Sequence, residues 1–229
     1  MKFSKSKKAP EISREIEDDY PVIILGAGGH SKVLIEMLKR NGTEIIGIVD
    51  PAFRKNTYIN DVPVIGDDSC VENHPADKIR LINGVGSIPG QNKRISIANT
   101  FRIKGYRFAR VVDLNSCVAS DAKLSEGVQI MPGVVIQPGV SIGPDTIVNT
   151  GVNIDHDCKI GSNVHIAPGA TLCGNVIVHD EVHIGSGTTV IQSVEIGKNC
   201  IIGAGSLVLV DVTTRQKLIQ KRVDYFSSI

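Results

Sequence analysis

The chain has 229 residues, and its 25 basic and 24 acidic side chains give a formal net charge of +1. This balance offers no electrostatic basis for binding nucleic acid or an anionic membrane surface. No apolar run is long enough to span a bilayer, and the first twenty residues lack the apolar core of a signal peptide. Five cysteines without a Cys-x-x-Cys motif favour a reducing compartment, so we expect a cytoplasmic protein.

The first part of the chain reads as a charged arm followed by a β-α-β unit. Residues 1–19 are charged and poor in apolar side chains, which predicts a flexible arm. An apolar strand over 21–25, an amphipathic helix and a second strand over 44–49 follow. A third strand and a second helix complete a predicted α/β, Rossmann-like domain, which we place at residues 20–110.

The turn after the first strand carries the chemistry of this domain. It reads Gly-Ala-Gly-Gly-His-Ser and opens a helix, where backbone N–H groups and the helix dipole attract a phosphate. An acid at the end of the second strand stands where a ribose or base is usually bound. The substrate-binding residues expected here are Gly26, Gly28, Gly29, His30, Asp50 and, after the third strand, Gly86.

A nicotinamide-binding domain is the alternative interpretation of this turn. Ser31 replaces the third glycine of the dinucleotide motif, and residues 20–110 give room for only half of the double β-α-β arrangement. A sugar nucleotide therefore fits the domain better than a dinucleotide.

A strict period of six residues begins at residue 111. An aliphatic residue stands at each of seventeen sixth positions from Val112 to Val208, and the residue four positions later is small or β-branched. Neither a helix nor an alternating strand repeats every six residues, whereas a β-solenoid of triangular coils does. We predict about five coils over residues 111–210, with residues 18 apart lying above one another. Glycines follow the aliphatic residue where we expect tight corners, at Gly143, Gly161, Gly185, Gly197 and Gly203.

A Rossmann-like domain leading into a hexad solenoid resembles one bacterial family. The resemblance rests on Gly-x-Gly-Gly-His after the first strand, on Asn149-Thr150-x4-Asp155-His156-Asp157, and on a histidine nine residues beyond His156. This family comprises UDP-bacillosamine and perosamine N-acetyltransferases and sialic acid O-acetyltransferases. The resemblance implies an all-β left-handed parallel β-helix, a homotrimer, and acetyl-CoA as co-substrate in the cleft between neighbouring solenoids.

The resemblance also implies roles for individual residues. His156 matches the general base and Asp157 the acid beside it, and Asn149 matches an asparagine of the acceptor pocket. Acetyl-CoA would be held by residues that match the thioester contact and the amides along the pantetheine arm: His165, Gly174, Ser186 and Ala204. Where relatives often carry a second acid after Asp50, this chain has Pro51, which leaves the nucleotide base open.

The expected reaction is acetyl transfer from acetyl-CoA to the amine of a UDP-, GDP- or dTDP-linked amino sugar for surface glycan biosynthesis. The amine must lose a proton as it attacks, and a histidine with a pKa near 6.5 suits that task. His165 or a backbone N–H could stabilise the thioester oxyanion. Acetylation of a sialic acid hydroxyl is the alternative, because relatives of that kind share most of the motifs.

Two other classes of function remain possible. His165 and His183 are one coil apart, as in trimeric solenoids that bind zinc and hydrate carbon dioxide, but His179 falls in a different hexad. We therefore expect no metal. A non-catalytic scaffold would leave the glycine turn and the Asp-His-Asp cluster unexplained.

The end of the chain departs from the relatives. They usually close the solenoid with a Gly-x-Pro-Ala loop over the coenzyme, whereas this chain continues into a basic tail over 211–229 that could be helical. This tail would either replace the closing loop or leave the coenzyme less tightly held.

Overall fold

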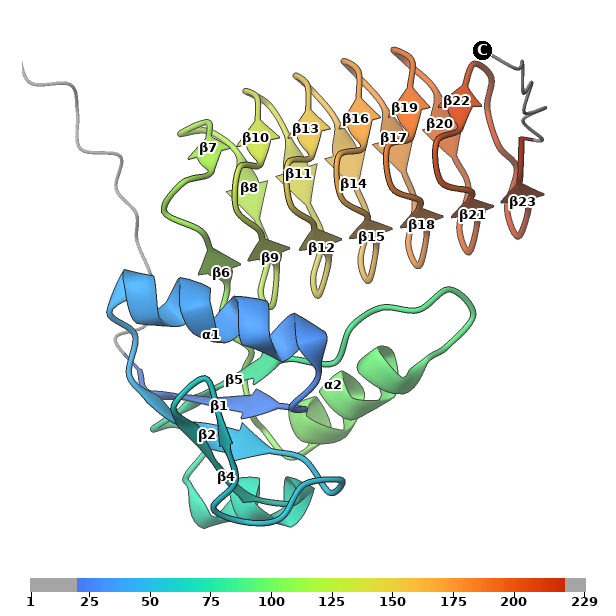
Figure 1. Cartoon of the computed structure of the whole chain (residues 1–229). Helices are drawn as coiled ribbons and strands as arrows, with labels where there is room; N and C mark the ends of the chain where they lie inside the picture. Colours follow the sequence, from blue (N-terminus) through green and yellow to red (C-terminus); the bar gives the residue numbers. More distant parts are fainter. Residues whose placement is uncertain (1–19, 221–229) are drawn as a thin grey trace, which may run out of the picture.

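The computed structural model describes residues 20–220, which form an α/β unit and a parallel β-solenoid (Figure 1). The predicted arm at 1–19 and the last nine residues of the predicted tail, 221–229, lie outside the described residues. None of the helices in the described part of the chain is long and apolar enough to span a membrane.

The α/β unit is a five-stranded sheet with helices on both faces. Its elements are β1 (Val22–Leu25), α1 (Gly29–Asn41), β2 (Ile45–Val49), β3 (Tyr58–Ile59), β4 (Val62–Gly66), a 3-10 helix η1 (Asp68–Asn73), β5 (Arg80–Asn83) and α2 (Lys93–Ile103). The strand order is β3-β4-β2-β1-β5, and only β3 is antiparallel to its neighbour. The carboxyl ends of β1, β2 and β5 therefore meet at one edge, where an open parallel sheet binds its ligands.

The sequence did not predict the β3–β4 hairpin. Pro63 interrupts its second strand, and a proline within an apolar run argues against a strand. In the structure Pro63 is the second residue of β4 and pairs with Tyr58 of the edge strand β3. The pairing of β4 with β2 begins only at Val64, so the proline precedes the parallel ladder.

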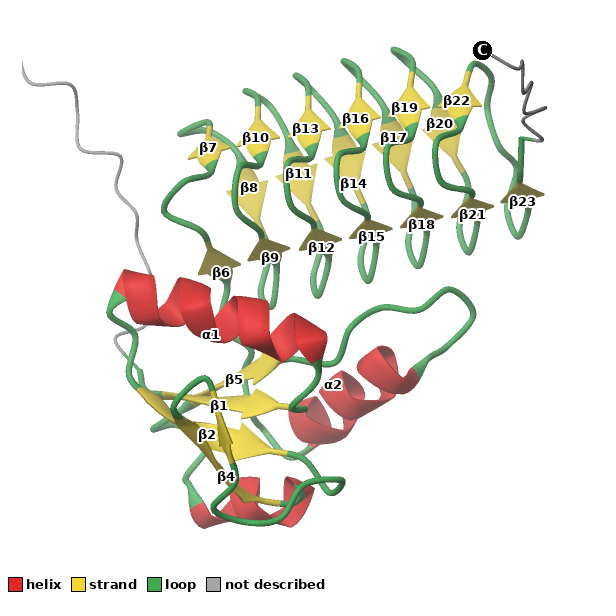
Figure 2. Ribbon diagram, in the orientation of Figure 1, coloured by secondary structure: helices red, strands yellow, loops and turns green. Residues whose placement is uncertain are grey.

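The solenoid consists of three parallel sheets made of two-residue strands (Figure 2). The domain-facing sheet contains β6 (Val111–Val112), β9 (Gln129–Ile130), β12 (Ile147–Val148), β15 (His165–Ile166), β18 (His183–Ile184), β21 (Ile201–Ile202) and β23 (Lys217–Leu218). The second sheet contains β7 (Cys117–Val118), β10 (Val135–Ile136), β13 (Asn153–Ile154), β16 (Thr171–Leu172), β19 (Thr189–Val190) and β22 (Leu207–Val208). The third sheet contains β8 (Lys123–Leu124), β11 (Ser141–Ile142), β14 (Lys159–Ile160), β17 (Ile177–Val178) and β20 (Glu195–Ile196).

The hexad period is the register of these sheets. Residues 18 apart pair from coil to coil, as in His165 with His183, and the aliphatic column points into the prism, where Ile130 and Ile154 are at most 1% exposed. Leu34 and Leu38 of α1 join the same buried cluster as Ile130. One continuous core therefore links the α/β unit to the solenoid.

The corner glycines are required for a different reason from the one predicted. Gly143, Gly185 and Gly197 do not have the positive φ of a tight left-handed turn. A Cβ on Gly143 would instead lie 2.6 Å from the backbone carbon of Gly161, one coil further on. The left-handed positions stand two residues later in each corner and often hold aspartate or asparagine, which tolerate that conformation.

The described part of the C-terminal tail is not helical. Residues 211–220 add a further, shortened coil, in which Val212 bridges to Ile196 and β23 pairs with β21. Ile202 aligns with Leu218, only 16 residues later. This coil is therefore two residues shorter than the others, and the six-residue period does not extend into it.

Candidate active site

The glycine turn is open at the N-terminus of α1. Gly28 is the N-cap residue, and no side chain caps the helix. Gly28 and Gly29 are exposed, and a Cβ on either would meet no other atom within 4 Å. Uncapped N–H groups at a helix N-terminus bind anions, so the geometry of this turn is compatible with a phosphate.

Ser31 and Asp50 hold the turn in place. Ser31 is fully buried, and its Oγ donates to the carbonyl oxygen of Gly26 at 2.5 Å and lies 3.0 Å from that of Gly84. The Asp50 carboxylate accepts from the backbone N–H of Ala27 at 2.8 Å and from that of Ala52 at 2.9 Å. Ser31 thus ties β1 to β5 where a dinucleotide motif has its third glycine, and Asp50 is fixed beside the turn.

His156 lies on the corner between the second and third sheets. Its Nδ1 is 2.8 Å from Oδ2 of Asp157, and its backbone N–H donates to the Asp155 carboxylate at 2.8 Å. A carboxylate only accepts, so Nδ1 carries the proton and Nε2 has the free lone pair. The hydrogen bond to Asp157 raises the pKa of His156 above its usual value, and the ring is exposed.

The stacking of coils shapes the space around this imidazole. Asp157 has a left-handed φ of 62°, which directs its carboxylate back toward the ring. A Cβ on Gly139, one coil before, would lie 2.5 Å from Oδ1 of Asp157, and a Cβ on Gly174, one coil after, would lie 2.6 Å from Nε2 of His156. Both glycines therefore leave room for the His156–Asp157 pair.

His165 and Asn149 lie on the domain-facing sheet and its corner with the second sheet. Oδ1 of Asn149 accepts from the N–H of Thr150 at 2.8 Å, so its Nδ2 faces Nε2 of His165 at 3.2 Å. Nε2 of His165 is then an acceptor, and burial lowers the pKa of His165 to about 3. To donate to a thioester oxyanion from Nε2, His165 would have to change tautomer and release Asn149.

The predicted residues form two groups within one chain. The corner between the second and third sheets holds His156, Asp157 and Gly174. The corner between the domain-facing and second sheets holds Asn149, Ser186 and Ala204. The glycine turn faces the domain-facing sheet. One whole side of the prism, the second sheet, separates the two groups. A single chain therefore does not bring His156, the predicted base, to its own glycine turn.

The histidine column formed as predicted. The rings of His165 and His183 pack edge to face with centroids 4.9 Å apart. His179 lies elsewhere and bonds Glu195 at 2.6 Å. Among residues 20–220, no three histidine, cysteine or acidic side chains are placed to hold a metal ion.

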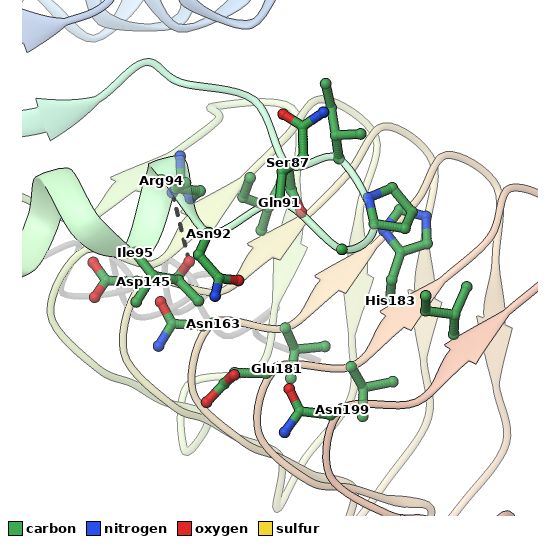
Figure 3. A pocket seen from close by; sticks show the side chains of 17 residues that line it. Ser87, Gln91, Asn92, Arg94, Ile95, Asp145, Asn163, Glu181, His183 and Asn199 are labelled. Carbon is green, nitrogen blue, oxygen red and sulfur yellow. Dashed lines mark hydrogen bonds between the residues drawn. The ribbon is translucent and has the colours of Figure 1, made fainter. Parts of the chain in front are cut away.

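A groove beside the site was not predicted from the sequence. The segment after β5, Ser87–Ile95, runs over the solenoid and encloses about 130 Å³ (Figure 3). Its solenoid wall includes His183 and a ladder of corner residues 18 apart: Asp145, Asn163, Glu181 and Asn199. The polar type and spacing of this ladder were visible in the sequence, but the segment that covers it was not predictable.

Gln129 is a second missed residue. It is 1% exposed, and it joins Nε2 of His30 to the backbone carbonyl of Asn83. The available signal was a glutamine between Val111 and Ile147, its aliphatic neighbours one coil before and one coil after.

The fold and the site define an acyltransferase of the hexapeptide-repeat class. Residues 21–101 match the PglD N-terminal domain, and residues 121–156, 157–192 and 175–209 match the bacterial transferase hexapeptide (six repeats). No curated protein matches the chain by sequence.

Solved structures narrow the class. A mutant of perosamine N-acetyltransferase from Caulobacter crescentus, in complex with CoA and GDP-perosamine, is 32% identical with a TM-score of 0.78, covering 86% of this chain and 92% of that one. The acetyltransferase domain of PglB from Neisseria gonorrhoeae, in complex with acetyl coenzyme A, is 28% identical with a TM-score of 0.78, covering 86% and 94%. WeeI from Acinetobacter baumannii, at 23% identity, a TM-score of 0.76 and coverage of 88% and 97%, shares the fold.

The chain belongs to the family of acetyl-CoA-dependent amino-sugar N-acetyltransferases that join a PglD-type domain to a left-handed parallel β-helix. The predicted fold and the predicted family are both confirmed.

Proposed function

We propose that this enzyme transfers the acetyl group of acetyl-CoA to the amine of a nucleotide-linked amino sugar, with His156 as general base. The observation that carries the proposal is the His156–Asp157 pair, whose hydrogen bond leaves Nε2 free on an exposed corner. The open glycine turn supports an acceptor that carries a nucleoside diphosphate, whose phosphate the turn would bind. We place the reaction in the cytoplasm, in surface glycan biosynthesis.

In this mechanism Nε2 of His156 takes a proton from the sugar amine while the nitrogen attacks the thioester carbonyl. Asp157 accepts from Nδ1 and stabilises the imidazolium that forms. When the tetrahedral intermediate breaks its C–S bond, His156 returns the proton to the CoA sulfur. The products are the N-acetyl sugar and the free thiol, and no covalent enzyme intermediate forms.

The active site would lie between two subunits of a homotrimer. The second sheet separates His156 from the glycine turn of its own chain, so the corner of one subunit must meet the turn of the next. The coenzyme cleft would then lie between two chains. One chain would line it with Asn149, His165, Ser186 and Ala204, and its neighbour would line the opposite side with Gly174.

A panel of acceptors tests the reaction. UDP-, GDP- and dTDP-linked 4-amino sugars and free sialic acid are each incubated with acetyl-CoA, and thiol release and product mass are followed. We expect one acetyl group to be gained by an amino-sugar nucleotide. Acetylation of sialic acid alone would replace the proposal with O-acetylation. If none of the acceptors caused thiol release, both proposals would be contradicted.

Subunit mixing tests the shared site. His156→Asn removes the base, and Gly28→Asp places a carboxylate in the phosphate position at a residue whose φ of −76° suits any side chain. Each variant alone should have little activity. After unfolding and refolding together, random trimers would regain about a quarter of the sites. Recovery of no activity would place the whole site within one chain.

A further inference from the structure

We propose that Gln129 is a positioning residue that holds His30 as its Nε2–H tautomer, so that Nδ1 of His30 accepts a hydrogen bond from the amino sugar. The inference rests on the proposed function and deepens it, because it assigns to the first coil of the solenoid a part in acceptor recognition.

The orientation of the Gln129 amide is fixed by its buried partners. The backbone carbonyl of Asn83 can only accept, so the atom 2.9 Å away must be Nε2 of Gln129. Oε1 of Gln129 therefore faces Nε2 of His30, at 2.7 Å. An amide oxygen also only accepts, and so Nε2 of His30 must carry a proton.

His30 has only that one proton at neutral pH. Burial and the nearby charge of Arg94 lower the pKa of His30 to about 4. The second ring nitrogen, Nδ1, therefore holds a lone pair. Within residues 20–220, Nδ1 has no hydrogen-bond partner, and this nitrogen is not fully buried. It is an open acceptor.

This result changes the role expected for His30. A phosphate oxygen only accepts, so a lone pair on Nδ1 would repel it, and the phosphate is left to the N–H groups of the turn. An Nδ1 acceptor fits a hydroxyl or the protonated amine of a sugar. His30 is the second residue of α1, and its Cβ lies 3.7 Å from the position of a Cβ on Gly86, beside the turn.

The network around Gln129 makes this arrangement rigid. Asn83 also accepts from the Arg94 guanidinium at 2.8 Å and donates from Nδ2 to the Arg94 carbonyl at 2.9 Å. Because Arg94 satisfies the Asn83 carbonyl on its own, replacing Gln129 by a methionine of similar size leaves no orphaned acceptor there. The variant should fold, and it releases the imidazole.

The first measurement is independent of activity. Nitrogen-15 NMR of labelled histidine distinguishes Nε2–H, Nδ1–H and imidazolium forms, and His30→Asn assigns the resonance. The wild type should show Nε2–H at neutral pH, and Gln129→Met should show a mixture of the two neutral tautomers. A wild-type Nδ1–H tautomer or imidazolium would overturn the proposal.

The second measurement addresses the substrate. In Gln129→Met, the KM for the amino-sugar nucleotide should rise roughly fivefold to tenfold, as for loss of one neutral hydrogen bond. The kcat, the KM for acetyl-CoA and the affinity for the bare nucleoside diphosphate should stay near wild type. Gln129→Glu should show imidazolium at His30 and at least the same rise in KM, because Nδ1 becomes a donor. Gln216→Met, at an exposed glutamine of the last coil, is the matched control.

These results separate two failures. If the bare diphosphate loses affinity as much as the amino-sugar nucleotide does, or if no KM changes, Nδ1 does not face the sugar. If the wild type acetylates no amino-sugar nucleotide, the proposed function has failed and the sugar contact fails with it, while the imidazole spectrum still decides whether Gln129 sets the tautomer.

Discussion

The imidazole of His156 lies against Gly174 of the next coil, so closely that a Cβ on Gly174 would be 2.6 Å from Nε2. Nε2 is the nitrogen with the free lone pair, because Nδ1 donates to Asp157. The solenoid therefore positions His156, the proposed base, partly through the absence of a side chain one coil away. Residues 18 apart in the sequence are in contact in space.

Gly174→Ala should move the His156 ring without unfolding the protein. The φ of Gly174 is not left-handed, so alanine suits the backbone, and the exposed ring can turn away. A displacement of about 1 Å can cost roughly 10²-fold in rate. We expect such a loss in kcat with an unchanged melting temperature. Lys159→Ala, on the third sheet, should leave both unchanged, and full activity of Gly174→Ala would refute this packing.

Asp157→Asn should shift the pH dependence of kcat/KM. The base must be neutral, so activity rises with pH through the pKa of His156, which the hydrogen bond to Asp157 raises. Asparagine removes the carboxylate charge and allows the other tautomer. The ascending limb should move to lower pH while the plateau rate falls. A limb that stays in place in the variant would mean that another group titrates.

Arg102→Ala should destabilise the junction between the α/β unit and the solenoid. Arg102 donates to both oxygens of Asp145, at 2.6 and 2.9 Å, and the Asp145 side chain is 5% exposed. Leaving that carboxylate unpaired should cost about 2–3 kcal/mol in the free energy of unfolding, with allowance for the partial exposure of Arg102. Denaturant unfolding measures it. Lys39→Ala, which breaks an exposed pair with Asp61, should cost less than about 1 kcal/mol, and equal losses would contradict the assignment.

Acid should destabilise the protein as the pH falls from about 6.5 toward 4. Burial lowers the pKa of His165 to about 3 and that of His30 to about 4, from a usual 6.5. The unfolded chain therefore binds protons in this window and the folded chain does not, so stability is complete above pH 6.5 and is lost below it. His156, with a raised pKa, acts in the opposite direction but is exposed.

Melting temperatures across this window test the assignment. His165→Asn should flatten the decline between pH 6.5 and 4, because the variant has one fewer buried imidazole to protonate. An exposed control, His179→Asn, should not flatten it. An identical decline in wild type and His165→Asn would show that His165 is already solvated or charged.

The solenoid was predictable because a period of six has one structural solution, and the period also fixes which residues stack. It placed His165 against His183 and His156 on an outer corner correctly. It failed at the last coil, where Ile202 pairs with Leu218 after only 16 residues. Because this coil is two residues shorter, its residues do not follow the six-residue period, and the coil could not be predicted from that period.

The contacts between the two units were not predictable. Gln129 meets His30 over 99 positions of sequence, and Arg102 meets Asp145 over 43. Such pairs depend on how the sheet of one unit is oriented against the face of the other, which no local pattern records. For the same reason the sequence indicated candidate residues without showing that His156 and the glycine turn lie on different sides of the prism.

The most direct test is the rate of acetyl transfer by His156→Asn at saturating acetyl-CoA and amino-sugar nucleotide. Asparagine can fill the space of the imidazole but takes no proton near neutral pH, so turnover should fall by roughly 10²–10⁴-fold. The oligomeric state, the melting temperature and both substrate affinities should change little, because the side chain is exposed and only the transition state needs the proton moved. The ascending limb of rate against pH should disappear. Near wild-type turnover, with that limb intact, would contradict the assignment of His156 as the base.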